Sequence, residues 1–493
     1  MTTPAIELDA ATGAGAGPAV DAGTHADAAV STDRLPLWRR DACGPWLVAA
    51  LAALLYGGFS LSQWRRYEVL SWDLGIFTQL ARRYAAFEAP VVTIKGDGFN
   101  LLGDHFHPLL VLLGPVYAAA PSALTLLVVQ DLLLATSVLV VAREAVRCTG
   151  RLAGTLVGVA YAVSFGLVGA VQAQFHEIAF AVPLLALSLV ALVRGRWLAC
   201  ALWAAPLVLV KEDLGLTVVA IGAVLAWRGR TRVGPLLSGW GLGWFLVTTF
   251  VLIPRLSARS RWDYASSIDV GALLSHPWVA AISFVDDRRK LTTLVLLVAV
   301  TGLIGLRSPV MLVALPTLAW RFLAGNEGYW THTWHYSAVL MPVVFVAMLD
   351  GIVQARSSPR RWLRRYAEVA VPVAVTVAVM LLPQGPLNRL SHADFYGPST
   401  RAAEARAALG LIPDDAVVET DVSLMSYLVD RTDVFYVGTG GNPVPDYVVI
   451  DTVAGGWGPA PEDAALYAEQ VHPGQTYRLL HEAGGYQVAQ RVP

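Results

Sequence analysis

Four short clusters of polar residues interrupt an otherwise strongly apolar sequence and carry most of the side chains that could do chemistry. They are Ser71-Trp72-Asp73-Leu74-Gly75 with Gln79, Gly103-Asp104-His105-Phe106-His107-Pro108, Gln174-Phe175-His176-Glu177, and Lys211-Glu212-Asp213. Carboxylates and imidazoles can accept or deliver protons, and lysine or histidine cations can stabilise developing negative charge. If the four clusters lie on one face of the protein, we expect them to line a polar cavity there.

The sequence around these clusters is typical of an integral membrane protein. Of the 493 residues, 55% are hydrophobic and only 15% are charged, and the mean hydropathy is +0.54. A soluble fold could not bury so much apolar surface, whereas lipid solvates it. The net charge of −1 favours no nucleic-acid partner, and the three cysteines imply no disulfide framework. The expected partner is therefore the lipid bilayer.

Apolar runs between residues 44 and 383, among them Leu291–Leu306, predict about eleven membrane-spanning helices. The strongest arginine-rich loops fall on one side under a single alternation, at residues 143–151, 194–196, 228–232, 307 and 356–365. The arginines at residues 255–289 fall on the other side, in a long loop that also contains four aspartates. The strongest basic loops stay in the cytoplasm, so we expect a cytoplasmic N-terminus and four polar clusters that face outward. The run His107–Ala120 is then a re-entrant or juxtamembrane helix, because a full crossing would invert the alternation.

The segments that flank the apolar runs have a different composition. Residues 1–43 lack apolar periodicity and predict a disordered cytoplasmic tail, while residues 62–107 form a large first outer loop. Residues 384–493 predict a small domain with one helix and three strands, at Thr400–Leu409, Ala416–Thr420, Val434–Val437 and Tyr447–Asp451. The expected fold class is an α-helical polytopic membrane protein with a small α/β extracytoplasmic C-terminal domain.

The order and spacing of the clusters resemble a known family. The matching motifs are Trp72-Asp73-Leu74-Gly75-Ile76-Phe77-Thr78-Gln79, His105-Phe106-His107-Pro108 with the run to Pro121, Phe175-His176-Glu177, and Lys211-Glu212-Asp213-Leu214-Gly215. They are similar to those of the bacterial membrane proteins called domain of unknown function 2079, over residues 44–451. That family in turn resembles the GT-C superfamily of membrane glycosyltransferases, which have a large first outer loop with an acidic residue. The resemblance implies sugar transfer from a polyprenyl-phosphate donor.

The same resemblance implies roles for individual residues. The first-loop carboxylate of the GT-C pattern matches Asp73, which would be the base for the acceptor hydroxyl or a metal ligand; His105 and Lys211 complete the catalytic set. The implied substrate-binding residues are Gln79, Asp104, His107, His176, Glu177, Glu212, Asp213, Trp334, His335 and Tyr336. No cofactor is certain. If a divalent cation takes part, Asp73, Asp104 and Glu177 are its candidate ligands. Gly103 would let the backbone approach a bound head group.

Two of these assignments have purely structural alternatives. Asp73 could cap the helix expected at Leu74–Tyr84, because aspartate is a favoured N-cap residue. His105 and His107 could form interfacial hydrogen bonds ahead of a helix that begins with a proline.

The other clusters have structural alternatives as well. Lys211 could be neutralised by the two acidic residues that follow it, in a cluster that only fixes helix packing. The pair His176-Glu177 could be an ordinary polar turn between helices. The segment Trp330–Tyr336 is most simply an aromatic belt at the membrane interface, although a lipid chain or a sugar could also use its rings.

The sequence is compatible with three functions from different classes. The leading hypothesis is a GT-C-like glycosyltransferase, or an inactive relative, that acts on the cell envelope at the outer leaflet of a bacterial plasma membrane. A transporter or flippase for a lipid-linked or polar solute would use the embedded charges Lys211, Glu212 and Asp213, but no inverted repeat supports it. A non-catalytic membrane scaffold is the third. Lys95, Lys211 and Lys290 are the only lysines, which is typical of GC-rich bacteria such as actinobacteria.

Overall fold

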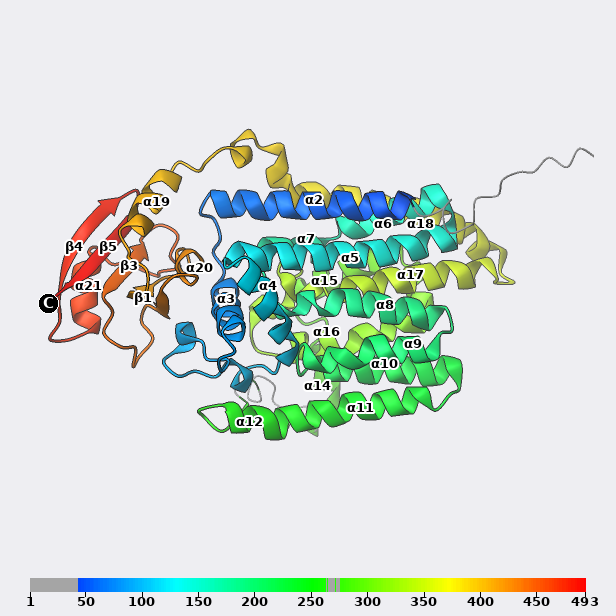
Figure 1. The fold of residues 1–493 in the computed structure, drawn as a ribbon. Coiled ribbons are helices and arrows are strands. Elements are labelled where there is room, and N and C mark those ends of the chain that lie inside the picture. The colour runs from blue at the N-terminus through cyan, green and yellow to red at the C-terminus, as the bar shows by residue number, and fades with distance from the viewer. Residues whose placement is uncertain (1–42, 263, 265–270, 272–274) are drawn as a thin grey trace, which may run out of the picture. The chain divides into compact units, whose positions relative to one another are not determined.

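Apolar helices dominate the chain from Cys43 to Gln384, named here the helical region (Figure 1). A second part, from Ala402 to Val492, contains a five-stranded sheet and is named the sheet region. The computed structural model describes residues 43–262, 264, 271 and 275–493. The tail expected at residues 1–43 lies outside the described residues, apart from Cys43.

Among the described residues, six helical segments are long and apolar enough to cross a membrane. They are α2 (Cys43–Arg65), α5 (Ala123–Thr149), α6 with α7 (Arg151–Ala162, Phe165–Ala173), α11 with η6 and α12 (Val233–Val247, Thr248–Leu252, Ile253–Leu256), η11 with α17 (His335–Ser337, Leu340–Arg356), and α18 with η12 (Arg361–Leu381, Leu382–Gln384). A helix rises 1.5 Å per residue, so roughly 20 residues span the hydrocarbon core. The chain is therefore a multi-pass membrane protein.

Five further apolar segments in the described chain are shorter. They are η3 with α4 (Pro108–Leu112, Leu113–Ala119), η4 with α8 (Glu177–Ala179, Ala181–Val193), α9 with η5 (Trp197–Ala204, Ala205–Leu209), α10 (Leu214–Gly229), and η9 with α16 (Pro309–Ala314, Leu315–Leu323). The first of them coincides with the run expected as a re-entrant or juxtamembrane helix. The exact number of crossings stays a prediction.

The prediction of one continuous helix at Leu291–Leu306 is wrong. Helix α15 (Arg288–Ala299) begins earlier, because the side chain of Asp287 accepts a 2.7 Å hydrogen bond from the backbone N of Arg289 and caps the helix. It also ends earlier, since Gly302 and Leu303 adopt φ angles of +55° and +61° and turn the chain into the short helix η8 (Ile304–Arg307). These left-handed conformations interrupt helical hydrogen bonding.

Helix α17 lies at the centre of the helical region, and nearly all of its side chains are buried. A helix that is apolar on all sides is expected in such a position. Helices α10 and α11 approach each other closely at glycines: a Cβ atom on Gly215 would lie 2.8 Å from the carbonyl oxygen of Gly241. Small residues permit this close packing in membrane helices. The packing fixes the start of α10, where the fourth polar cluster is located.

Helix α3 (Trp72–Ala85) forms within the first loop, which confirms the helix expected at Leu74–Tyr84. Its apolar residues Leu74, Phe77 and Leu80 are buried in a core that also contains Met425 and Val434 of the sheet region. Figure 1 shows α3 between the long helices and the strands. The helical and sheet regions therefore share one core, and residues 41–493 form one compact unit. A boundary between domains at residue 384 stays a prediction.

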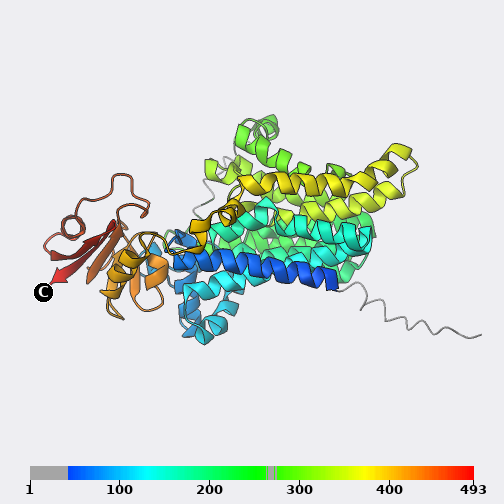
Figure 2. The same cartoon turned by 90° about the horizontal axis from the view of Figure 1, so that it is seen from above.

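The sheet region confirms the predicted α/β character. Its elements are α19 (Ala402–Gly410), β1 (Val417–Thr420), α20 (Met425–Leu428), β2 (Asp433–Tyr436), β3 (Tyr447–Asp451), α21 (Ala464–Val471), β4 (Thr476–Ala483) and β5 (Tyr486–Val492). The strand order is β2-β1-β3-β5-β4, parallel from β2 to β3 and antiparallel from β3 to β4. Figure 2 shows the strands and the long helices from a second direction.

The two faces of the sheet contact different helices. On β3, Val449 belongs to the core shared with α3, α19 and α20, whereas Val448 and Ile450 pack with α21 on the opposite face. This alternation is the period of two that a strand imposes. The sheet therefore uses one face to hold α3 against the helical region, and α3 carries Asp73.

Candidate functional site

Asp73 lies in the first turn of α3, where a negative charge is favoured by the helix dipole. It does not cap the helix, because the side chain of Ser71 accepts the hydrogen bond from the backbone N of Leu74, at 3.2 Å. The capping interpretation is therefore wrong. The Oδ2 atom of Asp73 lies 3.2 Å from Nε2 of His176, and the Asp73 side chain is 44% exposed. The carboxylate is held at one oxygen and remains accessible.

His176 is buried between two acceptors. Its Nε2 faces Asp73, and its Nδ1 lies 3.0 Å from the carbonyl oxygen of Gln174. An imidazole that donates from both nitrogens carries a proton on each and is positively charged. Burial opposes this charge, but the negative charges of Asp73 and Glu177 outweigh burial and raise the pKa of His176. Burial alone would raise the pKa of Asp73, but the positive charge of His176 outweighs burial and lowers this pKa.

The backbone around His176 is firmly positioned. The side chain of Gln130 on α5 accepts a 3.1 Å hydrogen bond from the backbone N of His176. Gln174 has a φ angle of +69°, an uncommon left-handed conformation for a residue with a side chain. The ring of His335 stacks on the ring of His176 with 3.5 Å between centroids. Contacts with α5 and with His335 therefore fix the position of this turn.

Lys211 reaches the third cluster instead of its own neighbours. Its Nζ donates a 2.7 Å hydrogen bond to Oε1 of Glu177, and the two side chains are only 17% and 5% exposed. Burial opposes the charge on Lys211, but Glu177 and then Asp213 and Glu212 raise its pKa well above the ordinary value. The ion pair thus links two clusters, and the alternative of a lysine neutralised by its own sequence neighbours does not describe this contact.

Glu212 binds the second cluster. Its Oε1 lies 2.6 Å from Nδ1 of His105, and its Oε2 accepts a 3.0 Å hydrogen bond from the backbone N of Phe106. Burial alone would raise the pKa of Glu212, but His105 outweighs it and lowers the pKa to about 2. Burial and Lys211 would lower the pKa of His105, and Glu212 reverses this, so the pKa is raised. The ring of Tyr264 covers His105, with 4.4 Å between ring centroids.

Three ion pairs therefore connect all four sequence clusters. The pairs are Asp73 with His176, Glu177 with Lys211, and Glu212 with His105. His176-Glu177 and Lys211-Glu212 are adjacent in sequence, so the pairs form a continuous row that we name the ion-pair row. The predicted convergence of Asp73, His105, His176 and Lys211 corresponds to this arrangement.

Two other residues expected in the site, Gln79 and Asp104, hold the first loop in position. The side chain of Gln79 donates to the hydroxyl of Thr93 and to the carbonyl of Val434, both at 2.8 Å, and accepts from the backbone N of Ile94 at 3.1 Å. Gln79 thus joins the first loop to strand β2 of the sheet region. Asp104 forms an ion pair with Lys95 of the same loop.

His107 and Asp213 have unpaired polar atoms. The Nδ1 atom of His107 and the Oδ1 atom of Asp213 are buried and have no hydrogen-bond partner among the described residues. Burial lowers the pKa of His107 to about 4 and raises the pKa of Asp213 to about 6, the latter against the opposing charge of Lys211. Both groups retain hydrogen-bonding capacity that a substrate could use.

The candidate metal ligands are separated by their partners. Within the described part of the chain, no group of three or more His, Cys, Asp or Glu side chains could hold a metal ion. Asp73, Asp104 and Glu177 pair with three different cations, His176, Lys95 and Lys211. A divalent cation therefore stays a prediction.

The aromatic segment Trp330–Tyr336 is only in part an exposed belt. Trp334 is 53% exposed, whereas His335 is buried against His176. The ring of Tyr336 contacts Tyr329, with 5.0 Å between centroids. The interfacial-belt interpretation thus fits Trp334 but not His335.

Arg321 of α16 was not predicted to support the site. Its side chain is fully buried and donates to the carbonyl oxygens of Tyr329 and Thr331, at 2.8 Å each, and to the hydroxyl of Ser337. It therefore holds the segment that brings His335 to His176. An arginine inside the apolar run Leu315–Leu323 was the available signal, because ionisable residues at such positions are costly.

Gly103 approaches protein backbone rather than a ligand. A Cβ atom at this position would lie 2.5 Å from both the carbonyl carbon of Leu256 and the backbone N of Ser257. We therefore expect Gly103→Ala to destabilise the protein by about 1–3 kcal/mol, because the backbone at Leu256 and Ser257 would have to move to admit the added Cβ atom. Thermal unfolding of the purified protein measures this. Gly325→Ala is the control, since nothing lies within 4 Å of its added Cβ atom; equal midpoints for the two variants would contradict the prediction.

The His105–Glu212 pair predicts a pH-dependent stability. Because the pKa of His105 is raised in the folded protein, its charge stabilises the fold fully below the ordinary histidine pKa of about 6.5. This stabilisation is lost as the pH rises through the folded-state pKa. Because the pKa of Glu212 is lowered, its charge stabilises the fold fully above the ordinary glutamate pKa of about 4.3. The difference in melting temperature between wild type and His105→Gln should therefore be largest between these values and shrink at higher pH. A difference that grows above pH 7 would contradict this.

Comparisons with known proteins agree with the fold. The family model described as "Predicted membrane protein (DUF2079)" matches residues 66–491. Among solved structures, the chain is similar to ArnT from Cupriavidus metallidurans, crystallised with bound undecaprenyl phosphate. The TM-score is 0.52 at 14% identity, over 91% of this chain and 98% of ArnT. The likeness shows that the chain shares the overall fold of ArnT. A comparison with curated protein sequences finds no match.

Proposed function

The chain belongs to the DUF2079 family of predicted membrane proteins, and from this premise we propose that it transfers a sugar from a polyprenyl-phosphate donor to an acceptor of the cell envelope. The fold supports a GT-C-like membrane protein. ArnT, which shares this fold, was crystallised with undecaprenyl phosphate, the kind of carrier lipid that the proposed donor would release. The single observation that carries the proposal is the ion-pair row with the accessible carboxylate of Asp73 at its end.

Asp73 is the proposed base. His176 occupies only its Oδ2 atom, and the side chain is nearly half exposed. Its Oδ1 atom can then accept the proton of an acceptor hydroxyl as that hydroxyl attacks the sugar. His176 orients the carboxylate and keeps it ionised until the acceptor arrives. His335, stacked on His176, fixes the plane of the imidazole.

Lys211 and His105 are the proposed stabilisers of the departing phosphate. Both are cations within the ion-pair row, and both keep part of their side chain exposed, 17% for Lys211 and 21% for His105. A polyprenyl phosphate leaves with its negative charge, and a preorganised cation lowers the barrier for that step. Glu177 and Glu212 hold these cations in place before the donor binds.

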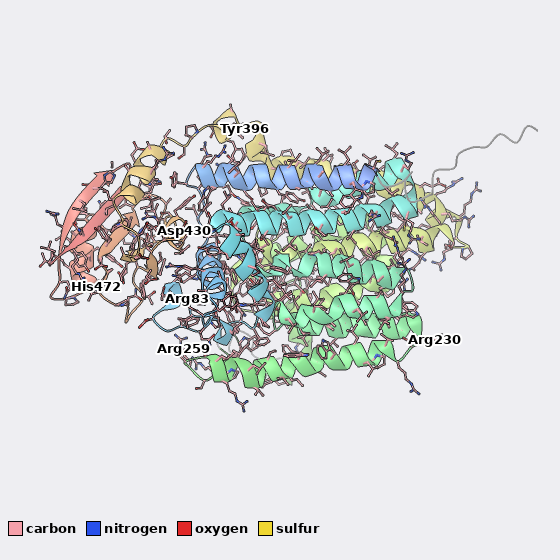
Figure 3. All side chains as sticks on the ribbon, viewed as in Figure 1. Arg83, Arg230, Arg259, Tyr396, Asp430 and His472 are labelled. Atoms are coloured by element: carbon pink, nitrogen blue, oxygen red, sulfur yellow. The ribbon has the colours of Figure 1, made fainter. Side chains whose placement is uncertain are left out.

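The face that carries the row is proposed to be extracytoplasmic. Arg230, in a basic loop expected inside the cell, lies at the end of the helices opposite to the sheet region, whereas Arg83 of α3 lies beside the sheet region (Figure 3). Basic loops favour the cytoplasm. The sheet region and the ion-pair row would then both lie outside, where polyprenyl-linked donors are used on the outer leaflet.

Deletion of the gene tests this proposal. Mass spectrometry of lipid extracts should show accumulation of a polyprenyl-linked sugar, and envelope glycans should lose the corresponding residue. Wild-type protein should restore both, whereas Asp73→Asn should restore neither. Asp97→Asn is the matched control, because Asp97 is an exposed carboxylate in the same loop.

The outcomes separate the alternatives. Unchanged glycans and unchanged polyprenyl-linked sugars in the deletion strain would overturn sugar transfer. A polyprenyl-linked sugar that keeps its total amount but accumulates on the inner leaflet would support a flippase instead. Restoration by Asp73→Asn would remove Asp73 as the base.

A further inference from the structure

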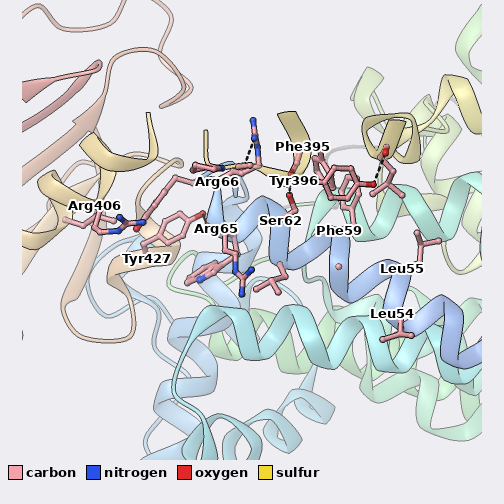
Figure 4. A pocket seen from close by; sticks show the side chains of 18 of the residues that line it. Leu54, Leu55, Phe59, Ser62, Arg65, Arg66, Phe395, Tyr396, Arg406 and Tyr427 are labelled. Carbon is pink, nitrogen blue, oxygen red and sulfur yellow. Dashed lines mark hydrogen bonds between the residues drawn. The ribbon is translucent and has the colours of Figure 1, made fainter. Parts of the chain in front are cut away.

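A cavity of about 1130 Å³ lies away from the ion-pair row, beside the end of α2 that points to the sheet region (Figure 4). Its walls come from α2, from the connecting segment with η13 (Pro386–Ser391) and η14 (Ala393–Tyr396), and from α19 and α20 of the sheet region. None of the residues of the ion-pair row lines it. The role proposed above therefore does not account for this cavity.

The cavity changes from apolar to basic along α2. Leu54, Leu55 and Phe59 line one end, within the part of α2 that is apolar enough to lie in a membrane. Leu54 is 73% exposed, so this end opens to the side of the helix. Gly58 widens it, because nothing lies within 4 Å of the position of an added Cβ atom. Figure 4 shows Leu54 and Leu55 at one end of the lining residues and Arg406 at the other.

Four arginines line the cavity, and two of them are already used by the protein. Arg66 binds Glu68 and the carbonyl oxygen of Gly397, the latter at 2.9 Å. Arg431 donates to the carbonyl oxygens of Ile412 and Leu409, at 2.5 and 2.7 Å. These bonds hold the side chains of Arg66 and Arg431 in the walls of the cavity.

The other two arginines that line the cavity are Arg65 and Arg406. Both are exposed, and neither has a hydrogen-bond or ion-pair partner among the described residues. Of the described residues that line the cavity, none is acidic. Two unpaired guanidinium groups beside an apolar wall are suited to a phosphate that carries hydrocarbon chains, because guanidinium groups bind phosphate through paired hydrogen bonds.

We infer that this cavity binds an anionic phospholipid of the bilayer, with its phosphate between Arg65 and Arg406 and its acyl chains along Leu54, Leu55 and Phe59. A bilayer phospholipid fits better than a rare carrier lipid, because the cavity opens at the lipid-facing side of α2 and matrix lipids reach it at the highest concentration. Basic groups at the membrane surface attract anionic lipids.

The walls are preformed for this ligand. Ser62 of α2 donates a 2.6 Å hydrogen bond to the carbonyl oxygen of Phe395, and Ser399 donates one of 2.8 Å to the carbonyl oxygen of Arg66. The ring of Tyr427 on α20 packs against Trp64 of α2, with 4.3 Å between centroids and 32° between the ring planes. A phosphate between Arg65 of α2 and Arg406 of α19 would add a link between the helical and sheet regions. The lipid therefore strengthens their attachment.

Thermal unfolding of the delipidated full-length protein in detergent tests this site. Added phosphatidylglycerol should raise the melting temperature of wild type by about 2 °C or more, and phosphatidylcholine should raise it less. The double variant Arg65→Gln/Arg406→Gln should lose the difference between the two lipids. Arg478→Gln, at an exposed arginine on strand β4 outside the cavity, should keep it.

Native mass spectrometry gives the second measurement. Wild type and Arg478→Gln should retain one more phosphatidylglycerol than the double variant. Equal retention, or an equal response of the double variant to both lipids, would overturn the inference. Binding of undecaprenyl phosphate that phosphatidylglycerol cannot displace would overturn the choice of a matrix phospholipid. Neither measurement depends on sugar transfer, so this site and the proposed function can fail separately.

Discussion

Asp73→Asn is expected to lower the rate of sugar transfer by about 100- to 10,000-fold, the usual cost of removing a general base. Asparagine keeps the shape of the side chain and can still contact Nε2 of His176. It cannot accept a proton from an attacking hydroxyl at neutral pH. The measurement is transfer from a polyprenyl-linked sugar by purified protein in lipid vesicles, with donor and acceptor both saturating.

The loss should lie in the chemical step and not in folding. Asp73 is 44% exposed, and without its carboxylate the pKa of His176 falls, so the buried imidazole can become neutral. Little buried charge is then left uncompensated, and the melting temperature should change only slightly. Asp97→Asn in the same loop should retain wild-type transfer. A fall in activity that follows a comparable fall in melting temperature would contradict a catalytic role for Asp73.

The helices and the parallel strands could be predicted because local sequence determines them. Strands β1 and β3, with the sequences Val-Val-Glu-Thr and Tyr-Val-Val-Ile-Asp, are short apolar runs between turn residues. The hairpin of β4 and β5 was not predicted, because β4 lacks the continuous apolar run of β1 and β3: buried Tyr477 is followed by exposed Arg478. Its turn at Gly484-Gly485 was the available signal, since both glycines have positive φ angles.

The clusters of the site could be predicted, but their pairing could not. Consecutive residues at a helix start point in different directions, so neighbours in sequence do not face each other. Lys211 therefore contacts Glu177 while Glu212 contacts His105, although the sequence places one positive and two negative charges side by side. The same divergence separates His176 from Glu177. Only tertiary packing, through α3 and the glycine contact between α10 and α11, determines which partner each residue meets.

The second large effect is expected for Lys211→Met. The variant leaves Glu177 buried at 5% exposure without its cation, and breaking a buried ion pair on one side costs about 3–5 kcal/mol. The melting temperature of the purified protein should fall accordingly, and transfer should be lost with it. Glu177→Gln alone should also destabilise, because it leaves the Lys211 cation buried.

The double variant Lys211→Met/Glu177→Gln separates structure from chemistry. It removes both charges, so most of the lost stability should return, because a buried pair and a well-packed neutral pair differ little in net free energy. Transfer should stay low, since the proposed stabiliser of the departing phosphate is absent. If the double variant recovered both stability and transfer, Lys211 would only support the fold. If it were as unstable as Lys211→Met alone, the pair would not carry the coupling that its 2.7 Å contact implies.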